Sequence, residues 1–159
     1  SSDGQTSVPL FETEFVEQRP RISPDGRWVA YESDEDGDTD VYVRPFPDVD
    51  SGKWKVSSQG GAHPIWSPDG SELYYMASGS MMAASITREP TFSAGNSEVL
   101  FEGRYYLNGL FPSFDLSPDG SRFLMMKPAG GQTDDSLAPL GFVVVFSWLD
   151  ELQRLMAVN

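Results

Sequence analysis

The sequence predicts an all-β fold made of repeated four-stranded antiparallel blades. Its 159 residues contain the tetrapeptide Ser-Pro-Asp-Gly three times, at 23–26, 67–70 and 117–120, so the repeats are 44 and 50 residues apart. Each copy has the chemistry of a tight turn, because proline pre-sets φ, aspartate accepts backbone hydrogen bonds, and glycine tolerates the left-handed conformation. Runs of β-branched and aromatic residues flank every copy, as in a hairpin. A four-stranded unit at this spacing predicts a β-propeller.

The first predicted element is a strand without a blade of its own, at 8–16. The pattern Pro-Leu-Phe-Glu at 9–12 repeats Val-Leu-Phe-Glu at 99–102, where an outer strand is expected in the second repeat. We therefore expect residues 8–16 to be a closing outer strand, which completes the last blade of a ring.

Three blades follow, at 18–58, 62–103 and 110–146. The first two contain four strand-like runs each, whereas the third has no candidate outer strand after Phe146. Propellers have about four to eight blades, and three cannot close a ring around a filled centre. We therefore expect half of a six-bladed propeller. It is completed either by a second copy, as a homodimer that exchanges its first strands, or by the missing half of a longer chain.

The last predicted element is a short amphipathic helix at 147–157. Ser147 suits the N-cap, and Arg154 lies near the end that favours positive charge. The apolar stripe consists of Trp148, Leu149, Leu152, Leu155 and Met156. We expect this stripe to pack on the last blade, and docking on a partner is the alternative.

Composition limits the classes of partner. The chain carries 24 acidic and 11 basic residues, a net charge of −13, and no cysteine. An acidic surface repels phosphate backbones, so we expect no nucleic-acid partner. No apolar run approaches the roughly 18 residues of a membrane span, so we expect no membrane partner. The charge is interpreted as serving solubility, with an acidic docking face as the alternative.

Candidate binding residues come from the repeat itself. Arg19, His63 and Ser113 each lie four residues before the serine of a turn motif, at the start of the strand that should be innermost in its blade. They should therefore meet at the mouth of the central channel. Solvated loop polarity is one interpretation. The other is a contact for a peptide or a small anion, with Arg19 and Arg21 supplying positive charge.

An acidic stretch between the second and third strands is a candidate metal site. Asp34, Asp36, Asp38 and Asp40 alternate around Gly37, in a pattern similar to oxygen-rich calcium loops. The distal bidentate glutamate of such loops is missing. An acidic hairpin turn is the favoured interpretation, weak Ca²⁺ binding is the alternative, and no other cofactor is expected.

Nothing in the sequence favours catalysis, and we expect that the chain is not an enzyme. His63 is the only histidine, and no Gly-x-Ser-x-Gly elbow accompanies it. Cysteine chemistry is excluded by composition. The aromatic residues alternate along the strands and are interpreted as packing between blades.

The repeat also carries a family resemblance. Pro-Ile-Trp-Ser-Pro-Asp-Gly at 64–70, followed by Leu-Tyr-Tyr at 73–75, resembles the WD40-like repeats of TolB-like propellers. Four further stretches resemble the C-terminal propeller half of bacterial kinase-linked sensor proteins, namely 41–47, 60–67, 99–105 and 148–155.

The resemblance covers about 9–156 and implies a sensor or protein-binding module without catalytic residues. It also implies a bacterial periplasmic or other extracytoplasmic location. We therefore expect a non-catalytic module that binds or scaffolds a protein or peptide. The alternatives are an accessory propeller that gates a hydrolase domain of the prolyl oligopeptidase type, and a purely structural half-propeller.

Overall fold

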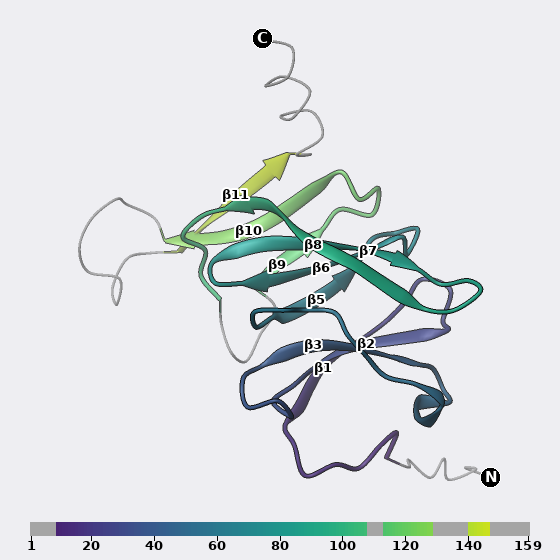
Figure 1. Ribbon diagram of the computed structural model, residues 1–159. Coiled ribbons are helices and arrows are strands. Elements are labelled where there is room, and N and C mark those ends of the chain that lie inside the picture. Colours follow the sequence, from purple (N-terminus) through teal and green to yellow (C-terminus); the bar gives the residue numbers. More distant parts are fainter. Residues whose placement is uncertain (1–8, 108–112, 129–139, 147–159) are drawn as a thin grey trace, which may run out of the picture.

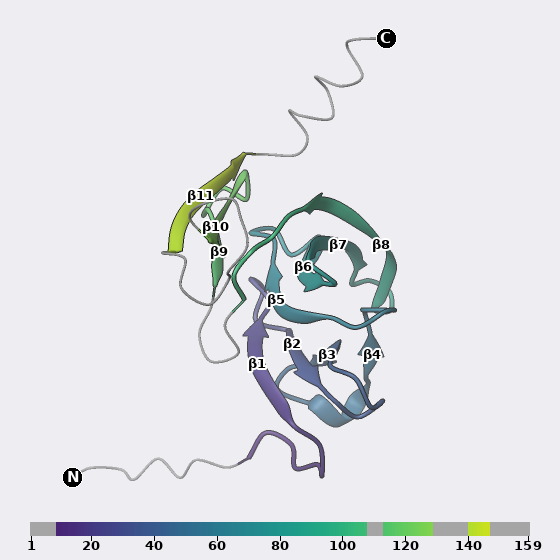
Figure 2. The same ribbon diagram turned by 90° about the vertical axis from the view of Figure 1, so that its left-hand side faces the viewer.

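The computed structural model describes residues 9–107, 113–128 and 140–146. Their strands form three antiparallel sheets that stand next to one another as blades (Figure 1). In the view turned by 90°, β1, β5 and β9 lie toward a common axis. The strands β4 and β8 lie at the opposite edges of their sheets, farthest from this axis (Figure 2). This radial arrangement is that of a propeller, so the predicted fold class is confirmed.

Two blades have four strands and the third has three, each in meander order. Blade 1 contains β1 (Glu17–Ile22), β2 (Trp28–Ser33), β3 (Asp40–Pro45) and β4 (Trp54–Lys55), with a 3-10 turn at Val49–Ser51. Blade 2 contains β5 (Ala62–Trp66), β6 (Glu72–Ala77), β7 (Ser80–Thr87) and β8 (Ser93–Glu102). Blade 3 contains β9 (Phe114–Leu116), β10 (Arg122–Pro128) and β11 (Leu140–Phe146).

The three Ser-Pro-Asp-Gly turns are built in the same way. In the first, the Ser23 hydroxyl donates to Asp25 Oδ1 (2.6 Å) and accepts from the backbone N–H of Trp28 (3.0 Å). Gly26 has φ +71° and donates its N–H to the carbonyl of Ser23. The serine–aspartate bonds recur in the second and third turns. The tetrapeptide therefore fixes the hairpin between the first two strands of each blade, as predicted.

The core lies between blades, because each sheet has two apolar faces. One face of blade 1, with Trp28 and Ala30, packs against Leu73 and Tyr75 of blade 2. The opposite face of blade 2 packs against Phe123 and other residues of blade 3. We call the face toward the following blade the forward face and the other the backward face. Alternation along each strand supplies both faces, which explains the aromatic content.

The closing strand expected at 8–16 and the helix expected at 147–157 are not among the observed elements. Among the described residues 9–16 no strand forms, and in the described part of the chain no sheet edge pairs with this segment. Phe11 instead packs on the Tyr31 ring, with centroids 5.1 Å apart. The helix predicted at 147–157 lies outside the described residues. In the part of the chain that is described, no helix is long and apolar enough to cross a membrane.

Candidate functional site

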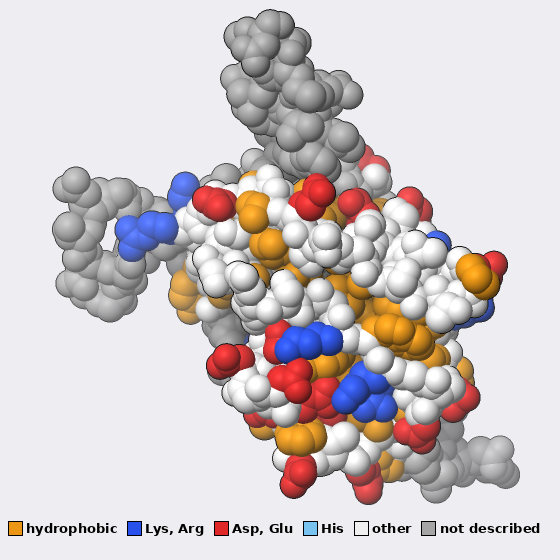
Figure 3. All heavy atoms as spheres, in the orientation of Figure 1, with side chains coloured by type: hydrophobic (Ala, Val, Ile, Leu, Met, Phe, Trp, Pro, Cys, Tyr) orange, Lys and Arg blue, Asp and Glu red, His pale blue; other side chains and the backbone are white. Residues whose placement is uncertain are grey.

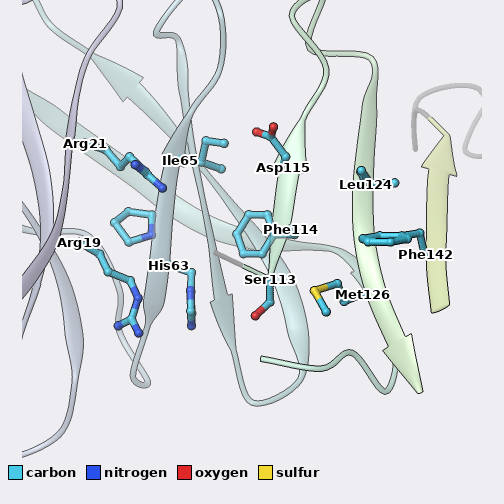
Figure 4. A pocket seen from close by; sticks show the side chains of 11 residues that line it. Arg19, Arg21, His63, Ile65, Ser113, Phe114, Asp115, Leu124, Met126 and Phe142 are labelled. Carbon is cyan, nitrogen blue, oxygen red and sulfur yellow. The ribbon is translucent and has the colours of Figure 1, made fainter. Parts of the chain in front are cut away.

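A pocket of about 620 Å³ lies where the inner strands of the three blades meet (Figure 4). All four predicted channel-mouth residues line it: Arg19, Arg21, His63 and Ser113. They come from β1, from β5 and from the residue just before β9. The structure thus brings together residues that are far apart in sequence, at the place that the repeat indicated.

The two innermost strands of blades 1 and 2 carry the same irregularity at this pocket. Arg19 has φ +52° and His63 has φ +56°, both in the left-handed region. The pairing register shifts at the same two places, which marks a β-bulge in each strand. A bulge redirects the side chains around it. The strained conformation costs about 1–3 kcal/mol for a residue other than glycine, so surrounding contacts must hold it.

Glu32 supplies those contacts. Its side chain, in the middle blade-1 strand β2, is fully buried. Oε2 accepts hydrogen bonds from Arg19 Nη1 (2.6 Å) and Gln18 Nε2 (3.0 Å), and Oε1 accepts from the backbone N–H of His63 (2.5 Å). One carboxylate therefore ties the bulge of blade 1 to the bulge of blade 2.

Sequence reasoning did not single out Glu32, although a signal was present. Glu32 lies nine residues after the first motif serine, and the same offset gives Met76 and Met126 in the other repeats. A charged residue at a repeat position that is otherwise methionine indicates a local role. In this structure Glu32 positions Arg19. Arg19 and Arg21 together form what we call the basic wall of the pocket.

The pocket carries charges of both signs: Arg19 and Arg21 lie on one side, the exposed Asp115 lines it nearer the apolar end, and the buried Glu32 pairs with Arg19. Burial lowers the pKa of His63 below its ordinary value, and the Arg19 charge lowers it further, so the imidazole is neutral at pH 7. Arg19 is compensated by Glu32. Among the described residues Arg21 makes no ion pair, and its carbonyl accepts a bond from Trp66 Nε1 (2.9 Å), which anchors its backbone to blade 2. Arg21 therefore presents its positive charge to the pocket.

The other end of the pocket is apolar. Figure 4 shows the basic side chains at one side and Leu124, Met126 and Phe142 at the other, with Phe114 between them. The Phe114 and His63 rings lie 6.1 Å apart. Phe142 is 75% exposed. The site can thus hold an anionic group next to an apolar one.

The acidic stretch is arranged as a salt-bridged turn. Lys55 Nζ lies 2.9 Å from Asp36 Oδ2 and 2.7 Å from Asp40 Oδ2. Asp36 also accepts from the Tyr42 hydroxyl, and these two hydrogen bonds lower its pKa. Asp34 accepts from the backbone N–H of Val16. Asp38 is exposed. The four carboxylates do not converge, and the described ranges contain no group of three or more metal-ligating side chains suited to an ion.

Away from the pocket the surface is acidic and mixed. On the face shown in Figure 3, acidic side chains are spread over the blades, with basic ones between them and small apolar areas exposed. This pattern agrees with the net charge of −13. In the pocket, by contrast, the two basic side chains of Arg19 and Arg21 lie together on one side.

Comparison with solved structures decides the fold. Oligogalacturonate lyase from Vibrio parahaemolyticus matches 75% of this chain with a TM-score of 0.56 and 13% identity. A TolB protein from Agrobacterium tumefaciens matches 82% of it with a TM-score of 0.52 and 18% identity. The chain has the fold of a TolB-like β-propeller. It spans 32% of the lyase and 47% of the TolB protein, so this propeller segment corresponds to part of each.

Comparison with curated sequences gives a partial match. An uncharacterized peptidase of Bacillus subtilis, YuxL, is 32% identical over 101 residues. The match covers 63% of this propeller chain and 15% of the peptidase. No protein-family model matches the chain.

Proposed function

We propose that this chain is a non-catalytic binding module that takes a protein or peptide at the channel-mouth pocket. The observation that carries the proposal is the convergence of Arg19, Arg21 and His63 with an apolar wall in one pocket. The ligand chemistry that fits is a carboxylate beside an apolar side chain, as at the C-terminus of a peptide.

The basic wall supports recognition of an anion. Arg21 carries charge without an ion-pair partner among the described residues, and Arg19 is held in a fixed orientation by Glu32. A guanidinium whose geometry is set in advance loses little entropy on binding a carboxylate. A neutral His63 adds a hydrogen-bonding group without adding charge.

The apolar wall supports recognition of a side chain. Leu124 and Phe142 are 41% and 75% exposed, which is unusual for large apolar residues grouped on one strand pair. Phe114 continues this surface toward the basic wall (Figure 4). A peptide lying across the pocket would bury these groups.

Self-association is the second part of the proposal. Blade 3 has three strands among the described residues, so β11 is an edge strand. An uncovered edge and an apolar sheet face favour addition of a strand or blade. A second copy that supplies three further blades would complete a six-bladed ring and the wall of the channel that is open here.

A peptide-binding measurement tests the pocket. The probe is a fluorescein-labelled tetrapeptide ending in phenylalanine, with either a free or an amidated C-terminus. Fluorescence polarisation should show about tenfold tighter binding of the free carboxylate. Arg21→Ala should abolish this difference. Arg27→Ala, which removes an exposed arginine outside this pocket, should preserve it. Equal binding of the two peptides, or binding of neither, would refute the proposed site.

A second candidate function is an accessory propeller that gates a hydrolase domain. The identity shared with a peptidase of Bacillus subtilis favours it. In that case the full reading frame should encode a hydrolase-type domain beside the propeller. This chain alone should then cleave no peptide, and the pocket would face the catalytic domain.

We also propose an extracytoplasmic location in a bacterium. The likeness to TolB-like propellers supports this proposal. A fusion of the complete gene product to alkaline phosphatase, which is active only outside the cytoplasm, tests it.

A further inference from the structure

The stack of three blades ends in two apolar faces of different kinds. The first end face is the backward face of blade 1, with Val29, Tyr31 and Tyr42, which are 1%, 1% and 2% exposed. The last end face is the forward face of blade 3, with Leu124, Phe142 and Val144, which are 41%, 75% and 46% exposed. The first end face is therefore covered over β2 and β3 but open at β1, where Ile22, the pairing partner of Val29, is 53% exposed, and the last end face is open.

The two end faces occupy complementary positions in the repeat. Val29 and Tyr31 stand at the offsets of Leu73 and Tyr75, which pack against the preceding blade. Leu124 stands at the offset of Tyr74, which packs against the following blade. The two end faces are thus the two halves of one interblade contact, and a single chain carries both.

The N-terminal segment covers the first end face as an outer strand would. Residues 9–12 repeat the pattern of 99–102, which belongs to the outer strand β8. Phe101 packs on Phe123 of the next blade, with centroids 5.4 Å apart. Phe11 packs on Tyr31 at 5.1 Å, on the same end face but two residues beyond Val29, the residue that stands at the offset of Phe123, and the Arg44 guanidinium lies 5.0 Å from the Phe11 ring.

This placement puts residues 9–12 on the first end face, close to the position that the outer strand of a preceding blade would take. The three inner strands of that blade are missing from the described part of the chain, and within the same residues blade 3 has three strands and no outer one. Its open forward face also matches the surface that the missing strands would present to blade 1.

We propose that the last end face of a second copy docks on the first end face, where residues 9–12 pair with its β11 as a fourth strand. The inference rests on the self-association in the proposed function. Two such contacts related by a two-fold axis close the ring. The pocket gains its missing wall in the same step, because Leu124 and Phe142 belong both to the pocket and to the last end face.

The register of the new strand pair follows from blade 2. There Met81 pairs with Phe101, and Ser80 pairs with Glu102. The strand pairings place Phe142 at the position of Met81 and Gly141 at that of Ser80. Phe11 should therefore lie opposite Phe142 of the second copy, and Glu12 opposite its Gly141.

Disulfide trapping tests this register, since the chain has no cysteine of its own. The variant Glu12→Cys/Gly141→Cys should oxidise to a dimer on a non-reducing gel and return to monomer with a reducing agent. Directly opposed residues have Cβ atoms about 5 Å apart, within reach of a disulfide. A bridge within one chain is excluded, because the N-terminal segment and β11 lie at opposite ends of the stack (Figure 1).

The matched control is Glu12→Cys/Lys127→Cys. Lys127 pairs with Gly141 but lies one strand further in, on β10. Adjacent strands are about 4.8 Å apart, which puts this pair beyond bridging distance. Equal cross-linking of the two variants would indicate random collision and overturn the proposal.

Sedimentation equilibrium measures the strength of the docking. Phe142→Asp should raise the dimer dissociation constant by about 100-fold or more, because each dimer contains the contact twice. Far-UV circular dichroism should be unchanged, since Phe142 is already exposed. Val99→Asp, at a 50% exposed site on β8, should not change the constant.

The outcomes separate this inference from the proposed function. A dimer that fails to cross-link at Glu12 and Gly141 overturns the docking geometry and leaves self-association standing. A chain that stays monomeric overturns the second copy as the occupant, in favour of further blades in a longer polypeptide. Peptide binding that depends on Arg21 is scored independently of both.

Discussion

Replacing Glu32 by methionine tests how the channel mouth is held together. Glu32→Met puts into blade 1 the residue that blades 2 and 3 have at the same offset, Met76 and Met126. The change removes a carboxylate acceptor from Arg19, whose side chain is only 18% exposed, and from the buried N–H of His63. Breaking a buried ion pair by removing one partner costs about 3–5 kcal/mol. We expect Glu32→Met to lower the free energy of unfolding by that amount.

The size of the effect should depend on Arg19. The double variant Arg19→His/Glu32→Met copies the combination of His63 and Met76 that blade 2 already has. It removes the Arg19 guanidinium as well, so the acceptor is lost by the buried N–H of His63, at a cost of about 1–3 kcal/mol, and by the amide of the exposed Gln18, which water can solvate. The double variant should therefore be more stable than Glu32→Met alone.

Urea unfolding followed by tryptophan fluorescence measures all four proteins of this cycle. Protein concentration must be equal throughout, because self-association contributes to apparent stability. A coupling energy of at least about 1 kcal/mol between the two sites is expected for groups in direct contact. Additive effects of the two single changes would refute the role assigned to Glu32.

Three further predictions concern the pH dependence of stability, one turn motif and Ca²⁺ binding. The pKa of His63 is lowered in the folded chain, so the unfolded chain takes up the proton first, and the urea midpoint should fall as pH drops below 6.5. His63→Asn should remove this fall, since asparagine tolerates positive φ at this position. Identical pH profiles of the two proteins would contradict the prediction. Hydrogen bonds from Ser71 and Ser67 lower the pKa of Asp69 to about 2, so its stabilisation is present above pH 3.8 and is lost toward pH 2. Asp69→Asn should cost no more than about 1 kcal/mol at pH 7, since the turn is exposed, and a larger loss in thermal unfolding would contradict this. Calorimetry with Ca²⁺ should show no heat, because Lys55 already bridges the acidic turn; a heat that Asp36→Asn abolishes would contradict it.

The hairpins and the channel-mouth set were predictable because they depend on local chemistry and on the repeat. Ser-Pro-Asp-Gly contains the proline, the capping hydroxyl and the glycine that its turn needs, so the turn forms wherever the sequence occurs. Counting back four residues from the motif serine then identified Arg19, His63 and Ser113, because equivalent residues of equivalent blades lie at equivalent places around the axis.

The remaining features depend on contacts between blades, which the sequence does not display. Glu32 ends a run of apolar residues in β2 and resembles a solvated strand end, whereas its burial is decided by blade 2 packing beside it. The left-handed backbone at Arg19 and His63 follows from the same contact. Residues 8–16 were expected as a strand, but a strand requires a neighbouring edge, and the described part of the chain places none beside residues 9–16.

The solution mass of the 159-residue chain tests the central claim, the proposed docking of the end faces of two copies, most directly. Multi-angle light scattering at micromolar concentration should give about 35 kDa, twice the 17.6 kDa of one chain. A folded species of 17.6 kDa that persists at all concentrations would contradict the account.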